Sequence, residues 1–243
     1  MNKESLEKTL KHLRKIRLPA MAEQLMMMIE NNELVSLSVE EVLERISEGE
    51  LMSRRNNTIT RLKKDSKLSQ RNARLEDVDY RPERKLNKSV IEQLRTNDYI
   101  SKHRNVILLG ACGTGKSYLA NALGNHACED LYKTYYVRLF EFLDECNHSQ
   151  LFTGSVEEKI KKYSKYDVLI IDDFLIHELE EKEANNLFKL IEYRWSHKTT
   201  IICSQLEPLE WHGRLGGTLL ADAILDRIIP SSHQLVLEGK SLR

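Results

Sequence analysis

The sequence lacks the features of a disulfide framework, a zinc site or a membrane span. Its four cysteines, Cys112, Cys128, Cys146 and Cys203, are scattered and form no C-x-x-C pair, which predicts a reduced, cytoplasmic protein without a disulfide or metal framework. No stretch reaches the roughly 18 consecutive apolar residues of a transmembrane helix. The polar start, Met1-Asn2-Lys3-Glu4-Ser5, is unlike a signal peptide.

Charge balances overall but is unevenly distributed along the 243 residues. Residues 1–53 carry 7 basic and 10 acidic side chains, residues 54–104 carry 15 and 7, and residues 105–243 carry 15 and 20. A basic middle between two acidic ends predicts an anionic partner for that middle, such as nucleic acid. A solvated charged helix and linker would explain the same pattern without a partner.

An apolar run, residues 106–109, leads into the octapeptide Gly110-Ala111-Cys112-Gly113-Thr114-Gly115-Lys116-Ser117. The octapeptide satisfies G-x-x-x-x-G-K-[ST], the phosphate-binding loop or P-loop. Glycines let the backbone turn its N–H groups toward one anion, and the following helix adds the positive end of its dipole. Lys116 would neutralise the β- and γ-phosphates of ATP, and Ser117 would hold Mg²⁺. The alternative is an ordinary glycine turn.

A second apolar run, residues 168–171, ends in the carboxylates Asp172 and Asp173, which is the form of a Walker B strand. We expect Asp172 to hold the hydration shell of Mg²⁺ and Asp173 to polarise the attacking water as a general base. The next apolar run ends in Ser204 and Gln205. A polar residue at this strand end would sense the γ-phosphate, and either side chain fits.

Arg227 lies in an amphipathic segment, residues 219–228, downstream of these strands. An arginine there could reach the γ-phosphate bound to a neighbouring subunit, as an arginine finger. The alternative is a local ion pair with Asp222 or Asp226, and Arg214 is a weaker candidate for the finger.

Helical periodicity predicts a small all-helical N-terminal domain over residues 1–64. Apolar residues recur at helical spacing over 2–18 and 20–31, and a capping box, Ser38 to Glu41, begins a third, longer helix. Such a small domain suits a partner-docking or DNA-docking role.

The rest of the chain predicts a linker and an α/β domain. Residues 65–80 are polar and weakly periodic, as in a linker, and residues 81–243 form the second domain. Five apolar strand patterns alternate there with helix patterns: 106–109, 134–137, 168–172, 199–203 and 234–237. This alternation predicts a five-stranded parallel sheet covered by helices on both faces.

These motifs, in this order, resemble those of the AAA+ ATPases. They are more closely similar to the IstB family, the transposition helper ATPases of IS21-type insertion sequences, which are related to the DnaC helicase loaders. The resemblance covers essentially the whole chain. It rests on the P-loop, on Leu169 to Phe174, on Ile191 to Arg194 and, most specifically, on Trp211, residues 219–228 and Glu238 to Arg243.

The resemblance implies an ATP-dependent protein that oligomerises on double-stranded DNA, deforms the duplex, and recruits and stimulates a partner transposase. The implied cofactors are ATP and Mg²⁺. By position, Asp172 and Asp173 match Walker B, Ser204 and Gln205 match sensor I, and Arg227 matches the trans-acting finger. The residues implied to bind the nucleotide are Gly110, Ala111, Cys112, Gly113, Thr114, Gly115, Lys116, Ser117 and Tyr118.

The sequence departs from the family pattern at several positions. Asp173 stands where many AAA+ proteins have glutamate, which predicts slow hydrolysis and a long-lived ATP state. Gln205 stands where related ATPases often have asparagine, and Leu242 takes a position that is often tyrosine. The chain ends just after the last predicted strand, so we expect no C-terminal lid domain.

Two basic stretches are candidates for DNA contact. Phosphate contacts are sequence-tolerant and salt-dependent, so we expect weak target specificity. One stretch, residues 54–74, has 8 basic residues and one acid, and includes Arg54, Arg55, Arg61, Lys63 and Lys64. The other lies in the helical insertion before Walker B and includes Lys159, Lys161 and Lys162.

Three other functions fit parts of the sequence. A DnaC-like replicative helicase loader would share the ATPase core, but residues 211–243 favour transposition. A small-molecule kinase would need an acceptor-binding lid, for which no segment is identified. A DNA-bending scaffold with an inactive ATP site would keep its DNA binding after Lys116→Ala.

Overall fold

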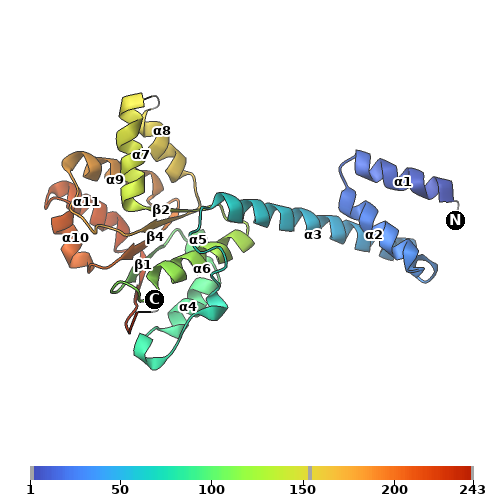
Figure 1. The fold of residues 1–243 in the computed structure, drawn as a ribbon, viewed down its shortest axis with the longest axis horizontal. Coiled ribbons are helices and arrows are strands. Elements are labelled where there is room, and N and C mark those ends of the chain that lie inside the picture. Colours follow the sequence, from blue (N-terminus) through green and yellow to red (C-terminus); the bar gives the residue numbers. More distant parts are fainter. Residues whose placement is uncertain (1–2, 153–154, 242–243) are drawn as a thin grey trace. The chain divides into compact units, whose positions relative to one another are not determined.

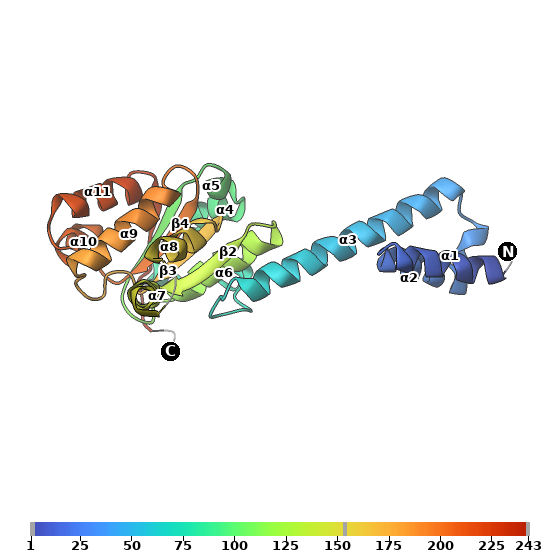
Figure 2. The same cartoon turned by 90° about the horizontal axis from the view of Figure 1, so that it is seen from above.

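The computed structural model describes residues 3–152 and 155–241 (Figures 1 and 2). Contacts within the chain divide it into two compact units, residues 1–61 and 62–243, and the boundary falls inside one long helix, α3 (Val39–Asp65). Among the described helices, none combines the length and the apolar character needed to cross a membrane.

The first unit consists of helices, as the periodicity predicted. It contains α1 (Lys3–Lys15), α2 (Pro19–Glu30), a 3-10 turn at Glu33–Val35 and the N-terminal part of α3. The capping box of α3 is present, because the Ser38 N–H donates to a Glu41 carboxylate oxygen at 2.7 Å and the Glu41 N–H donates to Ser38 Oγ at 3.2 Å.

A carboxylate of α3 caps the start of α2, which lacks a side-chain cap of its own. The N–H groups of Ala20 and Met21 donate to Glu50 Oε2 at 3.0 and 3.3 Å, and Arg54 Nε donates to Glu50 Oε1 at 2.8 Å. These N–H groups belong to the first helical turn and have no partner within the helix. The bond from Arg54, followed by the backbone bonds, holds the pKa of Glu50 below its ordinary value.

The second unit is built on a five-stranded parallel sheet in the order β2-β3-β4-β1-β5. This is the predicted α/β architecture. The strands are β1 (Asn105–Leu109), β2 (Thr134–Arg138), β3 (Val168–Asp172), β4 (Thr199–Ser204) and β5 (Ser232–Val236). The helices are α4 (Lys88–Arg95), α5 (Asp98–Ser101), α6 (Lys116–Glu129), α7 (Leu139–Phe152), α8 (Val156–Ser164), α9 (Glu181–Arg194), α10 (Pro208–Arg214) and α11 (Leu219–Ile228).

Side chains of the central strands point alternately to two separate cores, because successive residues of a strand face opposite sides of a sheet. Ile107 and Leu109 of β1 pack in a core with residues of α7 to α11. Val106 and Leu108 pack in a second core with residues of α4 to α6. Figures 1 and 2 show the two layers of helices that cover the sheet.

The edge strand β2 is covered by residues that precede the sheet. The Tyr136 N–H donates to the Ser66 carbonyl at 2.8 Å. Leu68, Ala73 and Leu75, which follow Ser66, are buried in the second core. Most of the stretch expected to be a linker, residues 65–80, therefore packs against the sheet.

Three details differ from the sequence prediction. Helices α5 and α10 were not predicted, because elements of four and seven residues are too short to show a repeating apolar pattern. Strand β5 begins at Ser232, earlier than the predicted residue 234. The apolar pattern missed its first two residues because Ser232 and His233 are polar.

Candidate nucleotide-binding site

The P-loop leaves the carboxyl end of β1 and enters α6. Gly110, Gly113 and Gly115 have φ values of 145°, 81° and 99°, a region that favours glycine. A Cβ at Gly110 would lie 2.2 Å from the carbonyl oxygen of Leu237, which leaves no room for a larger residue. The loop therefore has the backbone conformation of a phosphate-binding turn at the start of a helix.

The P-loop lysine is buried and bonded to its own loop. Lys116 Nζ donates to the carbonyl oxygens of Gly110 and Ala111 at 2.6 and 2.7 Å. Burial lowers the pKa of Lys116, while negative groups around it, Asp172 and Asp173 among them, act in the opposite direction. Because β1 and β3 are parallel strands of one sheet, the P-loop and the Walker B carboxylates lie at the same edge of it.

The two Walker B carboxylates have different surroundings. Asp172 is 4% exposed, and its oxygens accept hydrogen bonds from the Tyr136 hydroxyl at 2.7 Å and from the Asp173 N–H at 2.9 Å. The Asp173 side chain is 41% exposed, and one of its oxygens lies 3.7 Å from Arg138 Nε. Asp172 is therefore fixed in the interior, whereas Asp173 is accessible and paired with a charge from β2.

The oxygen donors at this edge fit a magnesium ion that arrives with a nucleotide. Mg²⁺ prefers oxygen ligands and usually binds through one or two protein groups plus phosphates and waters. The Ser117 hydroxyl at the start of α6 and the Asp172 carboxylate at the end of β3 are such groups. No cluster of three or more His, Cys, Asp or Glu side chains that could hold a metal ion occurs within residues 3–152 and 155–241.

The two candidates at the end of β4 differ in accessibility. Ser204 is 1% exposed, and its hydroxyl donates to the Phe174 carbonyl at 3.0 Å while accepting from Trp211 Nε1 at 3.2 Å. Gln205 is exposed directly after the strand. Since Ser204 is occupied by contacts that hold α10 to the sheet, Gln205 is the better placed of the two to meet a phosphate.

A mostly apolar pocket of about 260 Å³ adjoins the P-loop. Its dimensions and walls suit an aromatic ring next to bound phosphates. Of the residues that line it, only Thr114, Gly115 and Tyr118 were predicted from the sequence, because the others belong to segments without a motif. The pocket is lined by Asp77, Val78, Asp79, Arg84, Leu86, Thr114, Gly115, Tyr118, Leu119 and Leu237.

Arg227 lies far from the P-loop of its own chain. Asn105 Nδ2, at the amino end of β1, donates to the Arg227 and Ile228 carbonyls at 3.4 and 3.3 Å, whereas the P-loop follows the carboxyl end of β1. The Arg227 side chain pairs with Glu192 at 2.5 Å. Its guanidinium carbon also lies over two aromatic rings, 5.2 Å from the ring centroid of Phe188 and 5.3 Å from that of Trp195. The ion pair is thus with Glu192, rather than with Asp222 or Asp226.

The basic residues of α3 predicted to contact DNA have different neighbours. Arg54 pairs with Glu50 at 2.8 Å, and Lys63 pairs with Glu129 at 2.7 Å. The remaining side chains in this group are exposed: Arg55, Arg61 and Lys64.

The lysines of α8 each lie near an acidic side chain. Lys159 and Lys162 lie 3.8 and 3.7 Å from Glu145, and Lys161 lies 3.5 Å from Glu157. Partly exposed pairs of this kind contribute little to stability, so phosphate groups could replace the acids at low cost.

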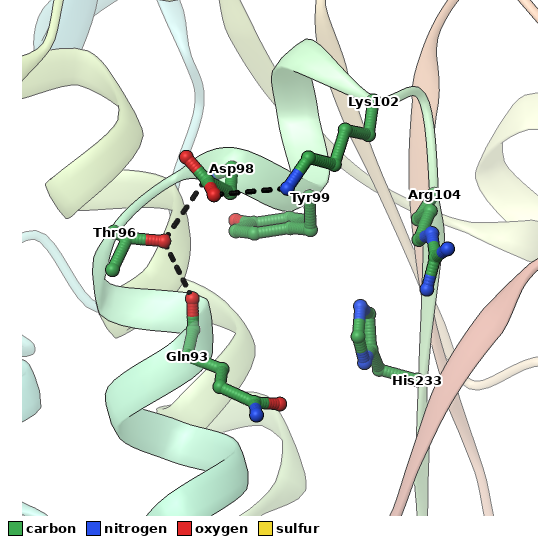
Figure 3. A pocket seen from close by; sticks show the side chains of 7 residues that line it. All are labelled: Gln93, Thr96, Asp98, Tyr99, Lys102, Arg104 and His233. Carbon is green, nitrogen blue, oxygen red and sulfur yellow. Dashed lines mark hydrogen bonds and ion pairs between the residues drawn. The ribbon is translucent and has the colours of Figure 1, made fainter.

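Another cavity has a volume of about 410 Å³. Figure 3 shows side chains that line it. His233 of β5 lines it and pairs with Val106, the second residue of β1. The P-loop begins after Leu109, so about 10 Å of strand separates the two. The cavity, also lined by Lys102 and Arg104, is therefore not part of the nucleotide site.

In the sheet, β4 separates the P-loop strand from the Walker B strand. Together with the composition of both strand ends, this order defines an ATP-binding P-loop protein of the AAA+ class. Residues 11–243 match the family model described as IstB-like ATP binding protein, and the chain belongs to that family.

Relatives of similar length carry insertion-sequence names. The chain is 31% and 34% identical to two insertion sequence ATP-binding proteins of Sinorhizobium fredii, over 97% of this chain and 94% and 95% of theirs. It is 30% identical to the ATP-binding protein of insertion sequence IS5376 from Geobacillus stearothermophilus, over 98% of this chain and 94% of that protein.

Solved structures of replication proteins share the fold. The DnaC helicase loader has a TM-score of 0.56 at 19% identity, covering 69% of this chain and 97% of that one. DnaI has a TM-score of 0.55 at 22% identity, covering 71% and 91%. The replication initiator DnaA, bound to AMPPCP and single-stranded DNA, has a TM-score of 0.56 at 20% identity, covering 69% and 50%.

Proposed function

We propose that this protein is an ATP-dependent, DNA-binding transposition helper. It oligomerises on target DNA, deforms the duplex, and recruits and stimulates a partner transposase. The observation that carries the proposal is the buried Lys116 of the P-loop at the same edge of the sheet as Asp172 and Asp173, in a chain of the IstB-like family.

Nucleotide binding follows from the groups around the P-loop. The base enters the apolar pocket beside Tyr118, and Lys116 exchanges its two carbonyl partners for phosphate oxygens. Ser117 and Asp172 would hold Mg²⁺, which neutralises phosphate charge when it is bound. The bond from the Tyr136 hydroxyl keeps Asp172 oriented for this role.

Hydrolysis depends on the accessible groups at the same edge of the sheet. Asp173 orients a water and accepts its proton as the general base. Gln205 contacts the γ-phosphate from the end of β4. The Arg138 guanidinium, 3.7 Å from the Asp173 carboxylate, holds the carboxylate to one side, which together with the short aspartate side chain gives slow hydrolysis.

Oligomerisation supplies a positive charge to the γ-phosphate from a neighbouring subunit. Arg227 lies at the opposite end of β1 from its own P-loop, which supports a role toward the nucleotide of a neighbouring subunit. DNA phosphates contact two basic groups: Arg54, Arg55, Arg61, Lys63 and Lys64 of α3, and Lys159, Lys161 and Lys162 of α8.

A DnaC-like helicase loader is the alternative. The likeness to DnaC and DnaI lies at 19% and 22% identity and supports the fold alone, whereas the relatives that match nearly the whole chain have insertion-sequence names. Capture of the purified replicative helicase, without capture of the transposase, would favour the loader.

A gel-shift titration tests the proposal. A duplex of about 50 base pairs is titrated with wild-type protein and Lys116→Ala, with ATP, ADP or no nucleotide, across a salt series. We expect cooperative, ATP-dependent binding that weakens steeply with salt and is lost in Lys116→Ala. Binding that ignores nucleotide would reduce the ATP site to a structural role, and absence of DNA binding would contradict the proposal.

A further inference from the structure

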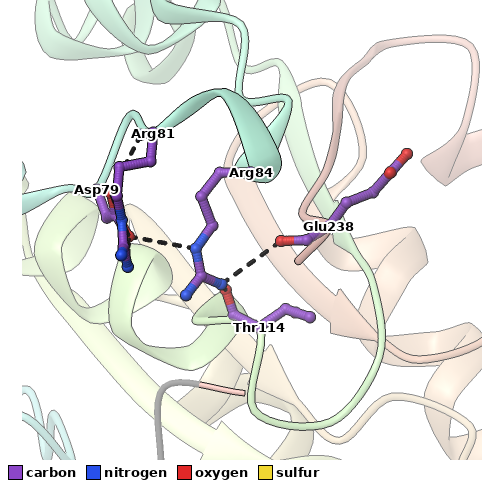
Figure 4. Close-up of polar contacts among 5 residues, drawn as sticks. All are labelled: Asp79, Arg81, Arg84, Thr114 and Glu238. Atoms are coloured by element: carbon purple, nitrogen blue, oxygen red, sulfur yellow. Dashed lines mark hydrogen bonds and ion pairs between the residues drawn. The ribbon is translucent and has the colours of Figure 1, made fainter. Parts of the chain in front are cut away.

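A buried arginine outside every sequence motif contacts the P-loop. Arg84 is 5% exposed, and its Nη1 donates to the Thr114 carbonyl of the loop at 3.3 Å. The same atom lies 3.5 Å from the Glu238 carbonyl, and Nε lies 3.3 Å from an Asp79 oxygen (Figure 4). One guanidinium therefore joins three segments: the residues before the sheet, the P-loop and the residues after β5.

The C-terminal segment Leu237–Ser241 lies directly against the P-loop. The Leu237 N–H donates to the Leu109 carbonyl at 2.7 Å, and the Glu238 N–H donates to the Arg84 carbonyl at 3.3 Å. A Cβ at Gly113 would lie 2.3 Å from Ser241 Oγ. The segment thus touches the loop at its first glycine and again at Gly113.

We propose that Arg84 is a positioning residue of the nucleotide site, which locks the C-terminal segment Leu237–Ser241 onto the P-loop so that this segment forms a wall of the phosphate site. The inference rests on the nucleotide binding of the proposed function and adds a determinant to it. Arg84 acts through the loop backbone and through the wall.

The physical reason lies in the geometry of the guanidinium. Arginine presents several N–H donors in a rigid plane, so one side chain can fix more than two acceptors at set angles. The acceptors here are backbone carbonyls at Thr114 and Glu238 and the Asp79 carboxylate. A lysine carries its three donors on one nitrogen at the end of a flexible stem, so it cannot reach acceptors spread around the plane of a guanidinium.

Coupling between the wall and the nucleotide follows. When Lys116 exchanges the Gly110 and Ala111 carbonyls for phosphate oxygens, the backbone of the P-loop must rearrange. Gly113 is in van der Waals contact with Ser241, so the adjustment reaches the C-terminal segment. We expect nucleotide to increase hydrogen-exchange protection of residues 237–241, and Arg84 to be required for that increase.

The test compares Arg84→Gln and Arg84→Lys with Arg81→Gln. Arg81 pairs with the same Asp79 carboxylate at 2.7 Å but is exposed, which makes it a matched control. ATP and ADP affinities are measured by calorimetry on the full chain, and amide exchange is followed with and without nucleotide. We expect both Arg84 variants to lose about tenfold or more in affinity and to lose the nucleotide-dependent protection of residues 237–241, and Arg81→Gln to stay within about twofold.

A second variant covers the case in which Arg84→Gln does not fold. Glu238→Pro removes the N–H donated to the Arg84 carbonyl and leaves the guanidinium in place, and we expect it to weaken the affinity and the protection in the same direction. If wild type binds ATP and all these variants bind it equally, Arg84 has no positioning role. If wild type itself binds no nucleotide, the proposed function fails instead.

Discussion

Tyr136 allows a direct measurement of how the Walker B carboxylate is held. Its hydroxyl donates to Asp172 Oδ2 at 2.7 Å in the interior, where Tyr136 is 8% and Asp172 4% exposed. Tyr136→Phe removes this donor and leaves a buried carboxylate with one fewer partner. Hydrogen bonds to charged groups contribute about 1.5–3 kcal/mol, so we expect the free energy of unfolding to fall by about that amount.

The assay is urea unfolding followed by circular dichroism, with Tyr135→Phe as the control. Tyr135 lies on the same strand but packs in the other core, near Tyr163 and Tyr166. We expect its substitution to cost about 1 kcal/mol or less, because Tyr135 is only half-buried and its neighbour Tyr163 is neutral. An equal loss of unfolding free energy in the two variants would refute the reasoning. The loss would then come from removing any tyrosine hydroxyl of this strand, and not from breaking the bond to Asp172.

Three further predictions concern other contacts. Arg138→Ala should raise the rate of steady-state ATP hydrolysis and leave ATP affinity within about twofold, because Arg138 holds the general base to one side and is not part of the P-loop; a slower rate or a large loss of affinity would contradict this. Glu50→Gln should lower the free energy of unfolding by about 1 kcal/mol at pH 7, measured by thermal unfolding. Because folding lowers the pKa of Glu50 from 4.5, the stabilisation by its carboxylate is complete above pH 4.5 and disappears as the pH falls through the folded pKa. Variant and wild type should therefore become equally stable at low pH. Arg194→Lys should lower the free energy of unfolding in urea by about 3 kcal/mol. The buried Arg194 donates to the Tyr163 and Tyr166 carbonyls and to Thr200 Oγ1, among others, and a lysine would leave some of these acceptors unpaired. A loss below about 1 kcal/mol would contradict this reason.

The sequence predicted the sheet well because each of its interior strands contains a run of consecutive apolar residues. Val168–Asp172 and residues 105–109 are buried throughout, and runs buried on both faces show as uninterrupted apolar letters. The predicted bounds of β5 differ from those in the structure for the opposite reason. It is an edge strand with polar residues at its start, so its pattern is weak.

The candidate site could be predicted only where its residues are adjacent in the sequence. The P-loop and the pair Asp172 and Asp173 form local motifs, in which residues close in sequence have related roles. Arg84, Tyr136 and Arg138 reach the site through the packing of separate segments, and no local pattern marks them. Tertiary contacts of this kind follow from the fold, so sequence periodicity carries no signal for them.

The two edges of the sheet differ in whether other residues pack against them. At one border, the Ser66 carbonyl already occupies the Tyr136 N–H, and residues 66–75 pack beside the strand. At the other, within the described chain, β5 pairs only with β1 and carries an exposed Val236. An open strand edge is where a foreign strand can add. Heat-induced aggregation of the folded protein should therefore start at β5, and a lysine at position 236 should delay it.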